Sequence, residues 1–349
     1  MPSSTRRALA TSAAAISLTL LATSCASDDG TTSAGGADGG AGAGGAFEPV
    51  TISHALGEAE ITEKPERIVT LGQGSAETAI ALGTVPVGIE EYPWGADDTG
   101  YLPWIHEAVE AEGAELPEQF TGGTELDVEA VLELEPDLIL APWSGLTQDQ
   151  YDLLADIAPT IAYPEQPWTI EWDEQIETIG EAMGQPEEAE KLVADLEAQL
   201  ADAAKPEYED LTFSYVYNDG PGTLGVFLPD EQRVAMVRAL GLTVDPMVDG
   251  LGEYEVAGTD SAVIGLENAD MLADSDLVFT FYSDPANRKE IEAQPLYAKI
   301  PAVERGSVVA AEDQSFVTAS SMINPLTVPW TLERYVPIID EAVGHLDEK

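Results

Sequence analysis

The chain has 349 residues, of which 65 are Asp or Glu and 14 are Lys or Arg, so its formal net charge is −51 at pH 7. A protein this anionic is not expected to bind nucleic acid or to adhere by charge to an anionic lipid surface. The single cysteine, Cys25, excludes an internal disulfide and any metal site with several Cys ligands. We interpret the acidic excess as a source of solubility outside the cell.

Residues 1–24 have the pattern of a signal peptide. Arg6 and Arg7 precede an apolar stretch over residues 8–22, which is shorter than the roughly 20 residues that a spanning helix needs. The arginine pair is compatible with the twin-arginine route as well as with general secretion, and the sequence leaves both open.

The stretch "LATSC" at residues 21–25 resembles the lipoprotein box of bacteria. That resemblance implies a diacylglyceryl group on Cys25, whereas ordinary cleavage just before it would leave a free thiol. Residues 25–47 are rich in Gly, Ala, Ser and Asp, and a flexible linker of that length has a reach on the order of 25 Å. We therefore expect a lipid anchor and a tether that hold the protein on the outer face of the cell membrane.

From residue 48 onward, short apolar runs alternate with amphipathic segments. A β-hairpin is predicted over residues 50–62, followed by a helix that Ser75 caps and that ends near Leu82. Such alternation favours a parallel sheet covered by helices on both faces. The remaining strands predicted in this half are residues 67–71, 85–89, 137–141 and 158–163.

Near the middle of the chain, the pattern predicts two helices in succession, over residues 172–183 and 186–205. Strands and helices then resume, with strands over residues 211–217, 275–282 and 306–311 and a terminal helix over 327–346. The predicted fold class is therefore α/β, with two similar lobes that have mainly parallel central sheets and are joined by one long helix. The expected divisions are an N-terminal lobe over 48–168, a helical connection over 169–206 and a C-terminal lobe over 207–349.

The two halves contain a related segment. "DVEAVLELEPDLILAPW" and "GLENADMLADSDLVFTFY" each have an early glutamate, a short helix, an acidic turn and a strand that opens Asp-Leu. Glu129 and Glu267 hold the equivalent places, each in the first turn of its helix.

Several stretches, in this order, resemble the ABC-transporter substrate-binding lipoproteins for iron–siderophores: "PERIVTLGQGSAETAIALGTVPVGI", "LDVEAVLELEPDLIL", "IAPTIAY", "IGEAMGQPEEAEKL" and "YAKIPAVERGSVV". The resemblance covers residues 48–346. It implies a monomeric receptor, without catalytic activity or cofactor, that delivers a ferric siderophore to an ABC permease dimer with its ATPase subunits. It also implies that Glu129 and Glu267 dock onto arginines of that permease.

Ligands of open α/β sheets bind beyond the carboxyl ends of the strands. In this sequence large aromatic residues follow those ends, and such rings line apolar cavities while keeping a polar edge. Arg233 follows a Gly-rich turn and is a candidate donor to chelate oxygens, although a surface ion pair with Asp230 would explain it equally; Arg288 is a weaker candidate. The aromatic candidates are Tyr92, Trp94, Trp143, Tyr217 and Tyr282.

The sequence fits other functions less well. An enzyme is disfavoured because the three histidines are scattered and no nucleophile motif or Walker A motif is present, and the same scatter disfavours a receptor for free zinc or manganese. A cobalamin or haem receptor of the same fold stays open, with Tyr217 or Tyr282 as a possible axial ligand of haem. The shortage of basic residues favours a near-neutral hydroxamate chelate over an anionic catecholate.

Overall fold

The computed structural model describes residues 47–218, 220–256 and 259–346. The predicted signal peptide, Cys25 and nearly all of the predicted linker lie outside these residues. Within the described ranges, no helix combines the length and the apolar character needed to cross a membrane.

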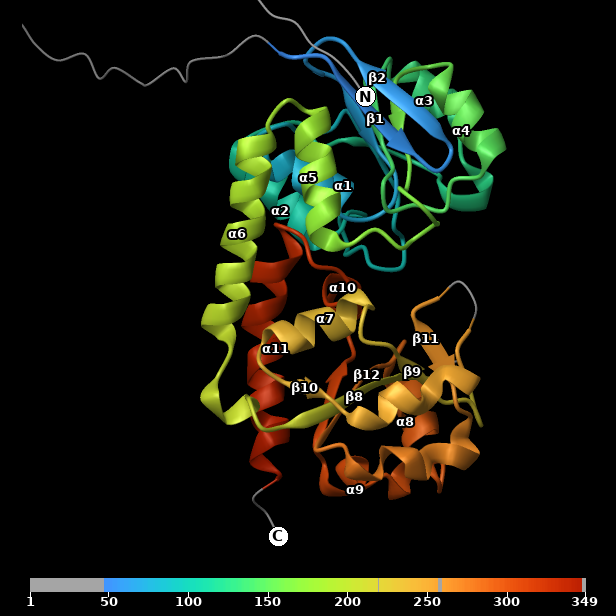
Figure 1. Ribbon diagram of the computed structural model, residues 1–349, viewed down its shortest axis with the longest axis vertical. Helices are drawn as coiled ribbons and strands as arrows, with labels where there is room; N and C mark the ends of the chain where they lie inside the picture. Colours follow the sequence, from blue (N-terminus) through green and yellow to red (C-terminus); the bar gives the residue numbers. More distant parts are fainter. Residues whose placement is uncertain (1–46, 219, 257–258, 347–349) are drawn as a thin grey trace, which may run out of the picture. The chain divides into compact units, whose positions relative to one another are not determined.

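The N-terminal lobe, seen at the top of Figure 1, contains a parallel sheet and a separate hairpin. The sheet has the strand order β5-β4-β3-β6-β7, and every neighbouring pair in it is parallel. Its two central strands are buried along their whole length, as expected for a sheet covered on both faces. The strands of this lobe are β1 (Val50–His54), β2 (Gly57–Ile61), β3 (Ile68–Thr70), β4 (Gly88–Glu90), β5 (Glu118–Phe120), β6 (Leu138–Leu140) and β7 (Thr160–Ile161).

The first helix of this lobe begins differently from the prediction. Its N-cap is Gly74 and not Ser75, and the hydroxyl of Ser75 has no hydrogen-bond partner in the described part of the chain. Gly74 has a φ of 85°, a conformation that suits glycine, and its N–H donates to the buried carboxylate of Glu77 at 3.0 Å. The helices here are α1 (Ser75–Ala81), α2 (Pro103–Glu112), α3 (Val128–Glu133) and α4 (Gln148–Ala155), with a 3₁₀ turn η1 (Gly123–Glu125).

Two consecutive helices connect the sheets, as the sequence predicts. α5 (Trp172–Ala182) has Met183 as its C-cap, Gly184 follows with a φ of 69°, and α6 (Pro186–Ala203) starts two residues after that glycine. The two helices pack closely, since a Cβ on Gly180 would stand 2.2 Å from the Cβ of Ala189. Further along α6, Leu196 and Leu200 are buried in the core of the second lobe.

The C-terminal lobe contains a six-stranded mixed sheet of order β11-β9-β8-β12-β13, with β10 beside the start of β8. β8, β10, β12 and β13 are parallel, whereas β9 and β11 form an antiparallel edge. The strands are β8 (Thr212–Tyr217), β9 (Gly225–Phe227), β10 (Thr243–Val244), β11 (Ser261–Val263), β12 (Leu277–Phe281) and β13 (Val308–Ala311).

Several helices of this lobe are 3₁₀ helices, which the sequence did not predict. The half-repeat helix that contains Glu267 is one of them, so the two half-repeats share their order but not their helix type. The helices are α7 (Gln232–Ala239), α8 (Pro285–Glu292), α9 (Pro301–Arg305), α10 (Gln314–Ala319) and α11 (Thr327–Gly344), with η2 (Pro206–Tyr208), η3 (Pro246–Glu253), η4 (Leu266–Asp274) and η5 (Tyr297–Lys299).

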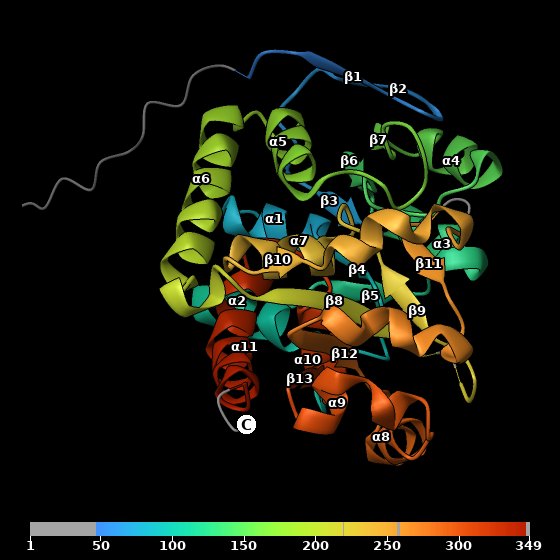
Figure 2. The same ribbon diagram turned by 60° about the horizontal axis from the view of Figure 1, so that its bottom comes forward.

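A second contact joins the lobes beside α6. α11 packs along α6, as Figures 1 and 2 both show, and its Trp330 meets Trp104 of α2 with ring centroids 5.5 Å apart. The Ser315 hydroxyl of α10 donates to the carbonyl of Gly95 at 2.8 Å. One side of the molecule is therefore closed by packed helices and by a buried polar contact, in addition to the connecting chain.

The predicted fold class, two α/β lobes with mainly parallel central sheets, is confirmed.

Candidate functional site

A cavity of about 360 Å³ lies between the two lobes and takes residues from both. The N-terminal side contributes Trp143, which follows β6, and the segment from residue 167 to the start of α5. The C-terminal side contributes the end of β8, the first turn of α7 and residues near β11. The cavity thus lies where the carboxyl ends of the central strands meet, as expected for open α/β sheets.

Two tryptophans form the N-terminal wall. The rings of Trp143 and Trp168 pack edge to face with centroids 4.6 Å apart. Trp168 has a φ of 66°, an uncommon backbone conformation for a large residue. Its ring lies directly over Gly145, where a Cβ would come within 2.5 Å of the indole. Glycine at position 145 is therefore what lets Trp168 approach Trp143.

Tyr217 and Phe227 form part of the opposite wall. Their ring centroids are 4.8 Å apart, and the Tyr217 hydroxyl donates to Ser261 Oγ at 3.2 Å. The ring of Tyr217 covers Gly225, because a Cβ there would stand 2.1 Å from it. The two walls together present broad apolar faces to a ligand, and polar and charged side chains line the rest of the cavity.

Arg233 reaches the cavity from the first turn of α7, but its charge is neutralised. Its Nη1 donates to Oε1 of Glu231, and its backbone N–H donates to the other carboxylate oxygen at 2.7 Å. The guanidinium also lies 4.9 Å from the centroid of the Phe227 ring. Burial raises the pKa of the Glu231 carboxyl, while Arg233 acts in the opposite direction. The partner is thus Glu231 and not Asp230, the ion-pair partner considered from the sequence.

A glutamine that the sequence did not single out also lines the cavity. Gln232 is 9% exposed, and its Oε1 accepts a hydrogen bond from the backbone N–H of Ile323 at 3.1 Å. That contact fixes the amide, and its Nε2 has no partner in the described part of the chain. The Nε of Arg233 is also buried and has no hydrogen-bond partner among those residues. Both are buried donors without an acceptor, which an oxygen-rich ligand would supply.

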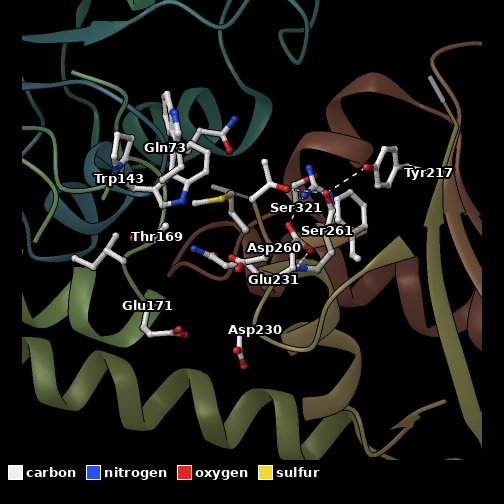
Figure 3. Close-up of a pocket in the computed structure, with 18 residues that line it drawn as sticks. Gln73, Trp143, Thr169, Glu171, Tyr217, Asp230, Glu231, Asp260, Ser261 and Ser321 are labelled. Carbon is white, nitrogen blue, oxygen red and sulfur yellow. Dashed lines mark hydrogen bonds and ion pairs between the residues drawn. The ribbon is translucent and has the colours of Figure 1, made fainter. Parts of the chain in front are cut away.

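Three exposed carboxylates line the cavity on its solvent-facing side (Figure 3): Glu171 at the start of α5, Asp230 before α7, and Asp260 before β11. We call them the rim carboxylates. Partial desolvation, then repulsion from Asp230 and other nearby acidic groups, raises the pKa of Glu171. The same two causes raise the pKa of Asp260. Sequence reasoning did not place any of the three at the cavity and named Asp230 only as an ion-pair partner for Arg233, because they come from segments about 30 to 90 residues apart that only the fold brings together.

Of the residues predicted to bind ligand, Trp143, Tyr217 and Arg233 lie together in the cavity. Tyr92 instead lines a separate, smaller pocket inside the N-terminal lobe. Trp94 is 46% exposed and lies outside the cavity lining.

Tyr282 lies in the core of the C-terminal lobe, and its hydroxyl meets that of Tyr297 at 3.3 Å. β12 ends at Phe281, and alternation along the strand turns Phe281 towards Arg233 and Tyr282 away from it. Burial raises the pKa of Tyr282. Arg288, the weaker candidate, pairs with Glu292 and Glu312 away from the cavity.

The two glutamates of the half-repeats are exposed. Glu129 lies in the first turn of α3, and Glu267 in the first turn of η4 with its carboxylate close to Gly265. Within the residues that the structure describes, no group of three or more His, Cys, Asp or Glu side chains is arranged to hold a metal ion.

The family model for periplasmic binding proteins matches residues 68–314. The ferric enterobactin-binding periplasmic protein FepB of Escherichia coli is 27% identical over 281 residues, covering 77% of this chain and 85% of FepB. The probable siderophore-binding lipoprotein YfiY of Bacillus subtilis is 26% identical over 288 residues, 78% of this chain and 83% of YfiY. The structure of PiaA from Streptococcus pneumoniae in complex with ferrichrome superposes with a TM-score of 0.76 at 28% identity, covering 84% of this chain and 99% of PiaA. The chain therefore belongs to the periplasmic binding protein family, a class of solute-binding proteins that are not enzymes.

Proposed function

We propose that this protein is an extracytoplasmic receptor that binds a ferric siderophore in the cavity between its lobes and delivers it to an ABC importer. The observation that carries the proposal is the cavity itself: aromatic walls from both lobes enclose buried donors that lack acceptors among the described residues. A ferric chelate has a broad organic surface and a ring of ligand oxygens, and this lining complements both. The similar proteins support this class of ligand: FepB is a ferric enterobactin-binding protein, YfiY is a probable siderophore-binding lipoprotein, and PiaA is in complex with ferrichrome.

The charge of the cavity favours a hydroxamate chelate. A ferric tris-catecholate is trianionic, and a receptor for it needs a net positive site. Here the cationic side chain of the lining, Arg233, is already paired with Glu231, and the rim carboxylates add negative charge. A ferric trihydroxamate is neutral at the metal centre, so it needs donors to its oxygens but no excess positive charge.

The chelate class is tested by titrating intrinsic tryptophan fluorescence with ferric hydroxamates, ferric catecholates, haem and cobalamin. Trp143 and Trp168 line the cavity, so bound chelate should quench them. We expect hydroxamates to bind at least tenfold more tightly than catecholates. Stronger binding of a catecholate would overturn the chelate class, and saturable binding of haem or cobalamin alone would reassign the ligand.

For delivery, we propose that Glu129 and Glu267 dock onto basic pockets of a permease dimer that works with ATPase subunits. Both carboxylates are exposed, one on each lobe. One carboxylate per lobe can meet two symmetry-related pockets and fix orientation at modest affinity. The alternative is that each Glu only complements its own helix dipole.

The docking role is tested with Glu129→Gln combined with Glu267→Gln. We expect chelate affinity and melting temperature to stay unchanged while iron uptake by cells is lost. Glu133→Gln with Asp270→Asn is a matched control, because these exposed acids lie on the same two helices. Normal uptake by the first double variant at wild-type surface abundance would remove the docking role.

The location of the protein is proposed from the sequence and its relatives. We propose that residues 1–24 direct export, that Cys25 is lipidated, and that the Gly-rich segment after it tethers the two lobes to the outer face of the cell membrane. YfiY is itself named as a lipoprotein. Radiolabelled palmitate should enter the wild-type protein but not a Cys25→Ala variant.

A further inference from the structure

Within the ranges 47–218, 220–256 and 259–346, the rim carboxylates have no counter-charge. The side-chain carboxylates of Glu171, Asp230 and Asp260 accept no hydrogen bond and form no ion pair there, although the backbone carbonyls of Glu171 and Asp260 do accept backbone hydrogen bonds. They come from both lobes yet are close enough to repel one another. Figure 3 shows Glu171 and Asp230 on the same side of the cavity, below the aromatic residues in that view.

Deeper in the same cavity, the polar groups suit a neutral chelate. Gln232 is buried, and its Nε2 has no acceptor in the part of the chain that the structure describes; Arg233 offers its guanidinium while Glu231 cancels its charge. These donors can meet ligand oxygens between the aromatic walls. The cavity therefore has two chemically different zones, a neutral donor zone inside and an anionic zone at the opening.

We infer that the cavity selects a ferric hydroxamate whose organic chain ends in a protonated primary amine, with the neutral iron centre against Gln232 and Arg233 and the ammonium among the rim carboxylates. This inference rests on the proposed function and narrows it to cationic chelates.

We expect a chelate with a terminal ammonium to bind more tightly than an uncharged analogue, because the ammonium offsets the repulsion among the rim carboxylates. The three carboxylates repel one another across the opening, and a single ammonium placed among them converts that repulsion into attraction. A single exposed ion pair contributes little because water and salt screen it. Three carboxylates around one cation act together, and the expected advantage over an uncharged analogue is about tenfold in affinity.

The test compares two ligands that differ only at this amine: a linear ferric trihydroxamate with a free terminal amine and the same molecule with that amine acetylated. Each is titrated into the wild-type protein by tryptophan quenching at 50 mM and 500 mM NaCl. A triple variant, Glu171→Gln, Asp230→Asn and Asp260→Asn, removes the rim charges. A second triple variant removes the same number of charges from exposed positions outside the cavity lining, on α5 and α6: Glu177→Gln, Glu181→Gln and Glu188→Gln.

We expect the free amine to bind the wild type about tenfold more tightly than the acetylated ligand at low salt, and the preference to shrink at high salt. The rim variant should bind both ligands with the affinity of the acetylated one, while the second variant keeps the preference. Affinities within twofold for the two ligands in the wild type, or an equal loss of preference in both variants, would overturn the inference and leave the proposed function standing. Absence of binding by either ligand would overturn both.

Discussion

Replacing Glu231 with glutamine should invert the charge preference of the cavity. In the folded protein this carboxylate pairs with Arg233 and also caps α7 by accepting the backbone N–H of the same arginine. Glu231→Gln keeps an oxygen for the cap but leaves the guanidinium with a net charge facing the cavity. An anionic chelate, disfavoured in the wild type, would then meet an uncompensated cation.

The size of the effect follows from Coulomb's law. One additional positive charge about 8 Å from a trianionic iron centre, at an effective dielectric constant of about 40 to 80, contributes about 1.5 to 3 kcal/mol. That corresponds to about a tenfold to hundredfold gain in affinity for a tris-catecholate. A neutral trihydroxamate should change by less than about threefold. Loss of the pairing should also lower the free energy of unfolding by about 1 to 3 kcal/mol, because Arg233 remains largely buried.

The assay is a pair of quenching titrations, with a ferric tris-catecholate and a ferric trihydroxamate, on the wild type and on Glu231→Gln at a temperature where both are folded. Urea unfolding supplies the stability change. Asp230→Asn is a suitable comparison, because it removes one carboxylate from the neighbouring position without freeing the guanidinium. An unchanged ratio of catecholate to hydroxamate affinity in folded Glu231→Gln would refute the conclusion that this ion pair sets the charge of the cavity.

Three other predictions concern the walls, the helix packing and a buried acid. Trp143→Ala combined with Tyr217→Ala removes one ring from each wall and should weaken chelate binding more than tenfold, and an unchanged dissociation constant would contradict the site. Gly180→Ala places a methyl group 2.2 Å from one on α6 and should lower the free energy of unfolding by about 1 to 3 kcal/mol in urea, whereas Gly344→Ala, with open space around it, should not. Burial raises the pKa of Glu77, so its contribution to stability is full at low pH and is lost as pH rises through its folded pKa. The stability of the wild type relative to Glu77→Gln should therefore fall as the pH rises above 4.5, the ordinary pKa of a glutamate carboxyl, and a constant difference would show that this carboxyl does not titrate as argued.

The regular parts of the fold were predictable because their signals are local. The central strands β3, β6, β8 and β12 are apolar runs, and the two connecting helices have a clear 3.6-residue period. The segments that the sequence did not predict are short, or they form only because a neighbouring strand pairs with them. β5, for example, is three residues long with two of them exposed, and it exists because β4 pairs with it.

The site was only partly predictable, for a different reason. The sequence placed Trp143 and Tyr217 at the cavity because a strand end fixes which edge of the sheet a residue reaches, and their binding of ligand stays a prediction. Tyr282 lies in the core instead, because β12 ends one residue before it and its side chain turns to the opposite face. Trp168 and the rim carboxylates lie on loops or helix starts, where no periodic signal says which way a side chain points.

The helical side of the molecule has a consequence for the rates of binding and release. α6, α11 and the contact of Trp330 with Trp104 hold the lobes together on that side, so entry of a ligand does not have to wait for a large rearrangement of the frame. Association should then be a single step whose observed rate increases in proportion to ligand concentration, without a plateau. Under the proposed delivery role, contacts within the cavity then set the dwell time of the ligand, and a transporter that shortens it has to move the lobes against this packed side.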